Sequence, residues 1–93
     1  MIYLDNAGTT KVSASVKQAM LPFFDEVYGN ASSLYTFGQR AKEQLEEARS
    51  MVAKCLNAHP REIYFTSGGS ESDNWAITAA AQIGARQNRK HII

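Results

Sequence analysis

The residues between positions 66 and 73 are the stretch of this sequence best suited to chemistry. They read Thr-Ser-Gly-Gly-Ser-Glu-Ser-Asp, follow the apolar run 63–65, and lead into a helical pattern from Ser70 to about Asn88. A glycine-rich turn from a strand into a helix gathers free backbone N–H groups at the positive end of the helix dipole, which suits an anion. Ser67 and Ser70 can add hydroxyl donors. The stretch is a candidate phosphate site, although ordinary turn chemistry explains a Gly-Gly-Ser turn equally well.

Two common phosphate motifs are excluded by the residues around the glycines. A Walker A loop needs Lys-Ser or Lys-Thr after its last glycine, and the dinucleotide fingerprint needs Gly-x-Gly-x-x-Gly. No spacing of Cys and His in the chain is typical of a metal site. The single cysteine, Cys55, falls on the apolar stripe of a helical pattern, so we expect it to be a small buried residue and not a nucleophile.

Length and composition favour one small domain or a piece of a larger one. The chain has 93 residues, 44% of them hydrophobic and 20% charged, with a formal net charge of +1. This balance gives no electrostatic reason to expect nucleic acid or an anionic membrane surface as a partner. A lone cysteine fits a reducing, cytoplasmic compartment. The last residues, 91–93, have the pattern of a strand that has just begun, which indicates a fragment.

Helical and strand patterns predict the elements that position the turn. Helices are expected over 13–28, with an interruption at Pro22, over 39–57 and over 70–88, with a loop over 30–38. A strand is expected over 62–66, and the order strand, helix, strand over 62–93 predicts an α/β fold with a parallel sheet. Ser70 is expected to cap the last helix, with Asp73 closing a capping box.

Four stretches, in order along the chain, resemble the start of the cysteine desulfurases, which belong to the pyridoxal-phosphate-dependent class V aminotransferases. Residues 3–10 resemble Tyr-Leu-Asp-Asn-Ala-Ala-Thr-Thr, and residues 28–38 resemble Phe-Gly-Asn-Pro-Ser-Ser-x-His-x-x-Gly. Residues 41–54 resemble the helix Ala-Arg-x-x-x-Glu-x-Ala-Arg-x-x-Val-Ala, and residues 65–74 resemble Phe-Thr-Ser-Gly-Gly-Thr-Glu-Ser-Asn-Asn. The Asn-x-Ser-Ser loop is typical of the branch that serves iron–sulfur assembly and nitrogenase maturation.

The resemblance implies the N-terminal part of a fold-type I large domain, with helices and the first strands of a mainly parallel sheet. Residues 1–12 would form an arm near the active-site entrance, and residues 13–93 the incomplete start of the domain that binds pyridoxal 5'-phosphate. Gly69 and Ser70 match positions that hold the cofactor phosphate. Asn6, Ala7 and Gly8 match the arm that holds the substrate. From the residues alone, a loose N-terminal arm is the favoured interpretation of positions 1–10.

The implied protein is a cytoplasmic homodimer that converts L-cysteine to L-alanine. It would pass the sulfur, as an enzyme persulfide, to a scaffold protein. The family's Schiff-base lysine, ring-stacking histidine, pyridine-binding aspartate and catalytic cysteine all match positions beyond 93, so these residues alone are expected to be inactive. The alternatives are a selenocysteine lyase or another class V enzyme, and a truncated non-catalytic relic. The sequence departs from the family pattern at Gly8, Ala31, Tyr35 and Asp73.

Overall fold

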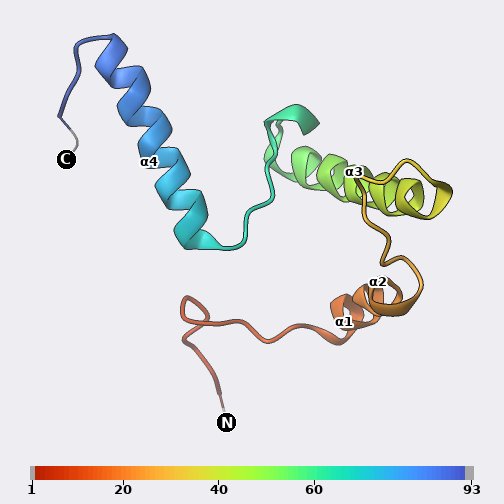
Figure 1. Ribbon diagram of the computed structural model, residues 1–93. Helices are drawn as coiled ribbons and strands as arrows, with labels where there is room; N and C mark the ends of the chain where they lie inside the picture. Colours follow the sequence, from red (N-terminus) through yellow and green to blue (C-terminus); the bar gives the residue numbers. More distant parts are fainter. Residues whose placement is uncertain (1, 92–93) are drawn as a thin grey trace. The chain divides into compact units, whose positions relative to one another are not determined.

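The computed structural model describes residues 2–91, and its regular elements there are four α-helices and one 3-10 helix (Figure 1). The chain divides into two compact units, Met1–Pro60 and Arg61–Ile93, which are described separately below. The first unit holds helices α1, α2 and α3. The second holds most of the 3-10 helix and all of helix α4.

Helices α1 (Ala14–Met20) and α2 (Pro22–Asp25) confirm the expected helix with an interruption at Pro22. The Ser13 side chain caps α1, since its Oγ accepts a hydrogen bond from the Val16 N–H at 3.3 Å. Pro22 occupies the first turn of α2, where the missing N–H costs nothing. The helical region ends at Asp25, three residues before the expected end at Tyr28.

Helix α3 (Thr36–Leu56) begins three residues before the expected start at Gln39. Its C-terminal end is a Schellman motif, in which the Ala58 N–H donates to the Ala53 carbonyl at 2.9 Å and the Asn57 N–H donates to the Lys54 carbonyl at 3.3 Å. Asn57 adopts the left-handed conformation with φ 52°, which asparagine tolerates better than most residues. The helix therefore ends at the point that the sequence pattern indicated.

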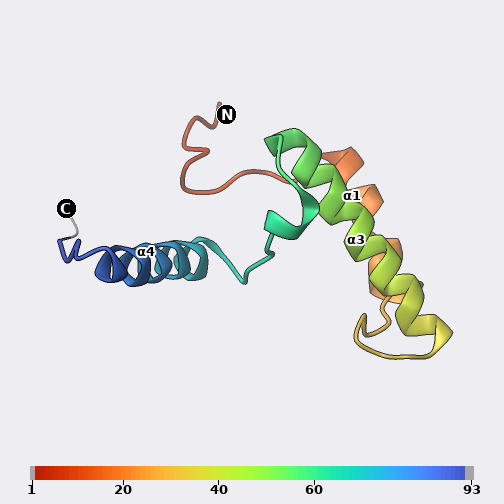
Figure 2. The same cartoon turned by 90° about the horizontal axis from the view of Figure 1, so that it is seen from above.

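The loop before α3 lies against the first turn of that helix (Figure 2). The Tyr28 and Phe37 rings meet edge to face with centroids 4.9 Å apart, and the Gln39 side-chain amide donates to the Ser33 carbonyl at 2.8 Å. Gly38 is buried inside this contact. The sequence pattern predicts Gly38 in the loop, but it lies in the first turn of α3, with no room for a Cβ against the loop.

Residues 62–66 do not form the expected strand. Pro60–Glu62 is a 3-10 helix, and the residues from 63 to 68 have no regular structure. A strand exists only through ladder hydrogen bonds to a neighbour, and the structure contains no second strand between residues 2 and 91. His91 has no regular structure either, and the other two residues of the second expected strand, at 92 and 93, lie outside the described residues.

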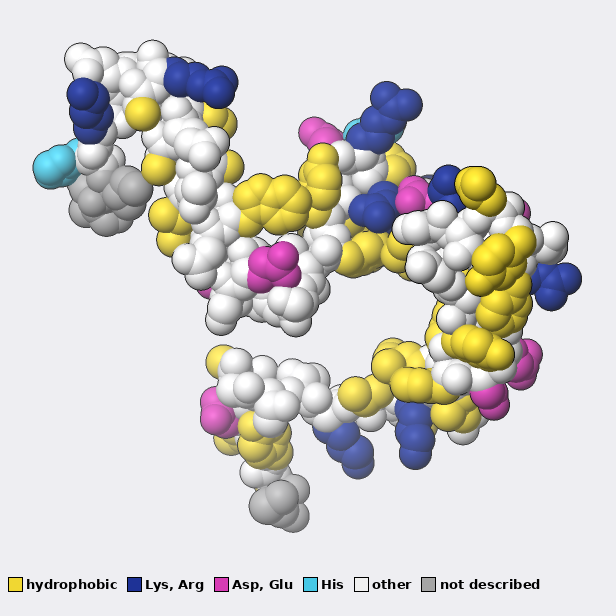
Figure 3. Space-filling model, viewed as in Figure 1, with side chains coloured by type: hydrophobic (Ala, Val, Ile, Leu, Met, Phe, Trp, Pro, Cys, Tyr) yellow, Lys and Arg dark blue, Asp and Glu magenta, His cyan; other side chains and the backbone are white. Residues whose placement is uncertain are grey.

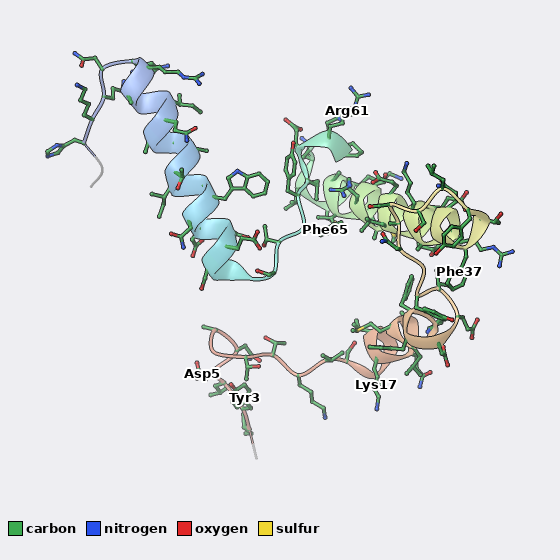
Figure 4. The ribbon with its side chains drawn as sticks, in the orientation of Figure 1. Tyr3, Asp5, Lys17, Phe37, Arg61 and Phe65 are labelled. Carbon is green, nitrogen blue, oxygen red and sulfur yellow. The ribbon has the colours of Figure 1, made fainter. Side chains whose placement is uncertain are left out.

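Helix α4 (Gly69–Arg86) confirms the expected helix after the glycine turn. The ring of Tyr64, in the segment that precedes the turn, meets the ring of Trp75 on α4 edge to face with centroids 5.2 Å apart. Figure 4 shows this segment, in which Phe65 is labelled, entering the first turn of α4. The contact holds the segment against the helix and so sets how the chain enters the turn.

Large apolar side chains stay exposed in both units (Figure 3). Leu56 is 66% exposed and Trp75 is 52% exposed, whereas Ala53 is the only buried hydrophobic residue among those that the structure describes. No other part of the described chain covers these apolar side chains. None of the helices between residues 2 and 91 combines the length and apolar character that a bilayer crossing needs.

Candidate functional site

Glu71 holds the turn between residues 66 and 72 through two hydrogen bonds to one carboxylate oxygen. One carboxylate oxygen, Oε2, accepts hydrogen bonds from the Ser67 N–H at 2.6 Å and from the Ser67 hydroxyl at 2.7 Å. Gly68 is the N-cap of α4, so Glu71 is the third residue of the helix. A glutamate at this position reaches back over the helix start, as in a capping box, but here it bonds the residue before the N-cap.

A second set of hydrogen bonds fixes the Gly68 carbonyl. It accepts from the Ser72 N–H at 3.2 Å and from the Thr66 hydroxyl at 3.2 Å. The Thr66 and Ser72 hydroxyl oxygens are 2.6 Å apart. Because the Thr66 proton goes to the carbonyl, the Ser72 hydroxyl is the donor in that short contact. Three hydroxyls of the turn, those of Thr66, Ser67 and Ser72, are therefore used within the turn itself.

The donors left over at the start of α4 include the Gly69 and Ser70 N–H groups and the Ser70 hydroxyl. The first N–H groups of a helix have no acceptor inside it, and within residues 2–91 no hydrogen bond from these three donors is found. All three belong to exposed residues at the positive end of the helix dipole. Gly69 and Ser70 are also the residues that match the family's phosphate-binding positions in the sequence.

Neither the backbone conformation nor the space around Gly68 and Gly69 requires a glycine at these two positions. Gly68 is extended, with φ 165° and ψ 179°, and neither Gly68 nor Gly69 has a positive φ in the left-handed range. A Cβ atom built on either residue would have no atom within 4 Å. Open space lies over the backbone at the point where the free N–H groups begin, which is room for an anion to approach them directly.

The two hydrogen bonds from Ser67 lower the pKa of the Glu71 carboxyl, with the hydroxyl contributing most and the N–H next, against a small opposing effect of desolvation. Glu71 is thus held as a carboxylate facing Ser67. Between residues 62 and 85 the sequence contains no lysine or arginine. This segment therefore offers a phosphate neutral donors and a helix dipole, without a cation of its own.

Acid is expected to release Ser67 from Glu71 only below the ordinary titration range of glutamate. Because the pKa of Glu71 is lowered in the folded turn, the contact stabilises the turn fully above the ordinary value of 4.5 and is lost as the pH falls through the lowered value. A carbon-13 NMR titration of the Glu71 carboxyl should show a midpoint below 4.5. In Ser67→Ala, which keeps the N–H but lacks the hydroxyl, the midpoint should move part of the way back. A wild-type midpoint at or above the ordinary value would contradict the contact.

The arm residues Asn6, Ala7 and Gly8 form an exposed turn in the first unit. The Asp5 carbonyl accepts from the Gly8 N–H at 3.1 Å and from the Thr9 N–H at 3.4 Å. The Thr10 hydroxyl donates to the Asn6 carbonyl at 3.2 Å. Figure 4 labels Tyr3 and Asp5 on this arm. The arm and the glycine turn belong to different units, so each candidate site is described by itself.

Several local expectations are wrong in detail. Gly68, not Ser70, is the N-cap of α4, and Glu71, not Asp73, reaches back across the helix start. The Ser67 hydroxyl, proposed as a phosphate donor, is bonded to Glu71 instead. Cys55 is exposed, whereas its place on an apolar stripe predicted burial.

The roles of Thr66 and Glu71 within the turn were missed in the sequence. The role of Glu71 could have been found from its spacing, because it lies three residues after Gly68, as the glutamate of a capping box lies three residues after the N-cap. The structure shows no group of three or more His, Cys, Asp or Glu side chains able to hold a metal ion within residues 2–91.

Comparison with known proteins gives a consistent result over the whole chain. The model of the family described as aminotransferase class-V matches residues 2–93. Proteins named cysteine desulfurase IscS are 48% identical in Clostridium botulinum (strain Hall) and 49% identical in Methanosarcina thermophila, each over 92 residues. The cysteine desulfurase NifS of Azotobacter vinelandii is 50% identical over 93 residues.

These alignments cover 99% of this chain in each case, but only 22–23% of each relative. The chain thus spans less than a quarter of the length of the curated relatives it matches. No solved structure matched the chain. Since the family match covers nearly every residue, the chain belongs to the class V aminotransferase family.

Proposed function

We propose that these 93 residues are the N-terminal portion of a pyridoxal-phosphate-dependent cysteine desulfurase. The full-length protein would convert L-cysteine to L-alanine and transfer the sulfur, as an enzyme persulfide, for iron–sulfur cluster or related cofactor assembly. It would act as a cytoplasmic homodimer that delivers sulfur to a scaffold protein. The observation that supports this best is the start of α4, where Gly69 and Ser70 present three free donors below open space.

The donors at the start of α4 fit the phosphate of pyridoxal 5'-phosphate. The Gly69 and Ser70 N–H groups and the Ser70 hydroxyl would donate to phosphate oxygens, and charged acceptors strengthen such hydrogen bonds. The bare Cα atoms of Gly68 and Gly69 let the phosphate come close to the backbone. Bound pyridoxal phosphate supplies an electron sink for the bonds of an amino acid substrate.

The phosphate would need a cation from residues outside the turn. The segment 62–85 carries no lysine or arginine, while Glu71 and Asp73 add negative charge to the first turn of α4. Glu71 is directed away onto Ser67 by two short hydrogen bonds, which keeps its carboxylate from the free donors. The proposed role of this chain is therefore to orient the phosphate, and neutralisation of its charge falls to other groups.

The arm would hold the substrate. Asn6, Ala7 and Gly8 lie in a turn whose side chains are exposed, and the Asp5 carbonyl fixes that turn through two hydrogen bonds. The Asn6 side chain offers both donors and an acceptor to an amino acid. This proposal is supported by the match of residues 3–10 to the family pattern and by the exposure of the turn.

The test of the proposed function is a turnover assay on the purified full-length protein. We expect it to retain pyridoxal phosphate through gel filtration, and to release alanine and, with a thiol reductant, an equal amount of sulfide from L-cysteine. Stripping and restoring the cofactor should abolish and restore both products. Strong preference for L-selenocysteine would assign the protein to the lyases instead, and failure to bind the cofactor would exclude the whole class.

A further inference from the structure

The direction of the Gly69 N–H is set by atoms that never touch the proposed phosphate. Residues 2–91 contain no cis peptide bonds, so the peptide between Gly68 and Gly69 is trans and planar. In a trans peptide the carbonyl and the following N–H point in opposite directions. Whatever holds the Gly68 carbonyl therefore also aims the Gly69 N–H.

The Gly68 carbonyl is held by two donors. The Ser72 N–H at 3.2 Å belongs to the helix and is present in any helix that starts here. The second donor, the Thr66 hydroxyl at 3.2 Å, comes from outside the helix. The Ser72 hydroxyl, 2.6 Å from the Thr66 oxygen, holds that hydroxyl in place.

No packing contact restrains this peptide plane. Gly68 and Gly69 have no side chains to pack, and no atom lies within 4 Å of either built Cβ position. Glycine is also the residue with the widest choice of backbone conformations. Without the Thr66 hydroxyl, the Ser72 N–H alone would hold the Gly68 carbonyl, and the direction of the Gly69 N–H would be less tightly fixed at this helix end.

We propose that Thr66 is a positioning residue for cofactor binding: its hydroxyl, held by the Ser72 hydroxyl, bonds the Gly68 carbonyl and so aims the Gly69 N–H at the phosphate. This rests on the proposed function, because the phosphate is that of pyridoxal phosphate. Thr66 itself makes no contact with the ligand. Its effect is specific to the phosphate and does not extend to the rest of the cofactor.

The experiment compares two ligands on the full-length protein stripped of cofactor. Thr66→Val keeps the branched shape and removes the hydroxyl, and Thr66→Ser keeps the hydroxyl as the matched control. We expect Thr66→Val to weaken pyridoxal phosphate binding about threefold to tenfold, as for loss of one neutral hydrogen bond. Binding of pyridoxal, which lacks the phosphate, should be unchanged, and Thr66→Ser should bind both ligands as the wild type does.

A double-mutant cycle tests whether Thr66 acts through the Gly69 N–H. Gly69→Pro removes that N–H, so Thr66→Val should cause no further loss of pyridoxal phosphate affinity in the Gly69→Pro background. Additive losses would overturn the proposal, and so would equal losses for pyridoxal and pyridoxal phosphate. If Thr66→Val does not fold, Ser72→Ala should show the same selectivity with a smaller loss, and equal losses for the two ligands would again overturn it.

Failure of this inference and failure of the proposed function give different results. A wild-type protein that binds no pyridoxal phosphate removes the proposed function. A wild-type protein that binds it, with a Thr66→Val variant of equal affinity, removes only the positioning role. The phosphorus-31 NMR shift of bound cofactor offers an independent readout, since it should change in Thr66→Val and be restored in Thr66→Ser.

Discussion

Replacing Gly69 with proline is expected to weaken pyridoxal phosphate binding about tenfold to 100-fold, as for loss of one hydrogen bond to a charged acceptor. The helix should survive, because Gly69 is the first residue of α4 and proline is well tolerated there. The residue before a proline must avoid the helical region, and Gly68 is already extended with φ 165° and ψ 179°. The change therefore removes the Gly69 donor and places a ring carbon where its hydrogen was, while leaving the helix start intact.

The measurement is a titration of the stripped full-length protein with pyridoxal phosphate, alongside circular dichroism to confirm that helix content is retained. Gly69→Ala is the matched control, since it keeps the N–H but places a methyl group in the open space above the turn. If Gly69→Ala loses less affinity for pyridoxal phosphate than Gly69→Pro does, the effect of proline is due to the missing N–H. If Gly69→Ala loses more, the effect is due to filling the open space. Equal affinity of Gly69→Pro and wild type would refute the phosphate site.

Gly38→Ala is expected to destabilise the first unit by about 1–3 kcal/mol, the usual cost of forcing an extra carbon into a packed position. A Cβ on Gly38 would lie 2.5 Å from the Asn30 carbonyl oxygen and 2.7 Å from the Ser33 Cβ. A backbone carbonyl cannot rotate away as a flexible side chain can. The loop would have to move off α3, and the hydrogen bond from Gln39 to the Ser33 carbonyl would be lost.

Urea unfolding of the stripped full-length protein gives the free energy of unfolding for this comparison. Gly68→Ala is the control, because its Cβ would meet nothing within 4 Å and its conformation is open to any residue. Hydrogen exchange should also become faster in the loop before α3 for Gly38→Ala alone. A Gly38→Ala protein as stable as the control would show that the loop does not rest on the helix.

The helices were predictable because their signals are local. Ser13 as a cap, Pro22 as an interruption and Asn57 as a terminator each act within a few residues of their own position. The start of α3 was misplaced because Gly38 has low helix propensity, and only its contact with the Asn30 carbonyl explains a glycine inside the helix. The strand at 62–66 was wrong because a strand needs a partner, and residues 2–91 do not provide one.

The position of the glycine turn at the start of α4 was predictable, and its hydrogen bonds were less so. A turn of two glycines before a helix indicates where free N–H groups gather. The choice of Gly69 and Ser70 as the phosphate-binding pair came from the resemblance to the cysteine desulfurases. The spacing of Glu71 after Gly68 indicates that its side chain reaches back across the helix start. Which hydroxyl it takes depends on rotamers, which the sequence does not give. Gly68, not Ser70, is the N-cap because the helical backbone already begins at Gly69.

The relaxed backbone at Gly68 and Gly69 has a consequence for how substitutions in this protein are interpreted. Neither glycine is under strain and neither is crowded, so a screen for folded or abundant protein should accept many residues at both positions. A screen for growth that depends on the activity should reject most of them. At Gly38 both screens should reject most substitutions, because a Cβ there would collide with the backbone carbonyl of Asn30. Disagreement between stability and fitness would thus mark the residues that face a ligand.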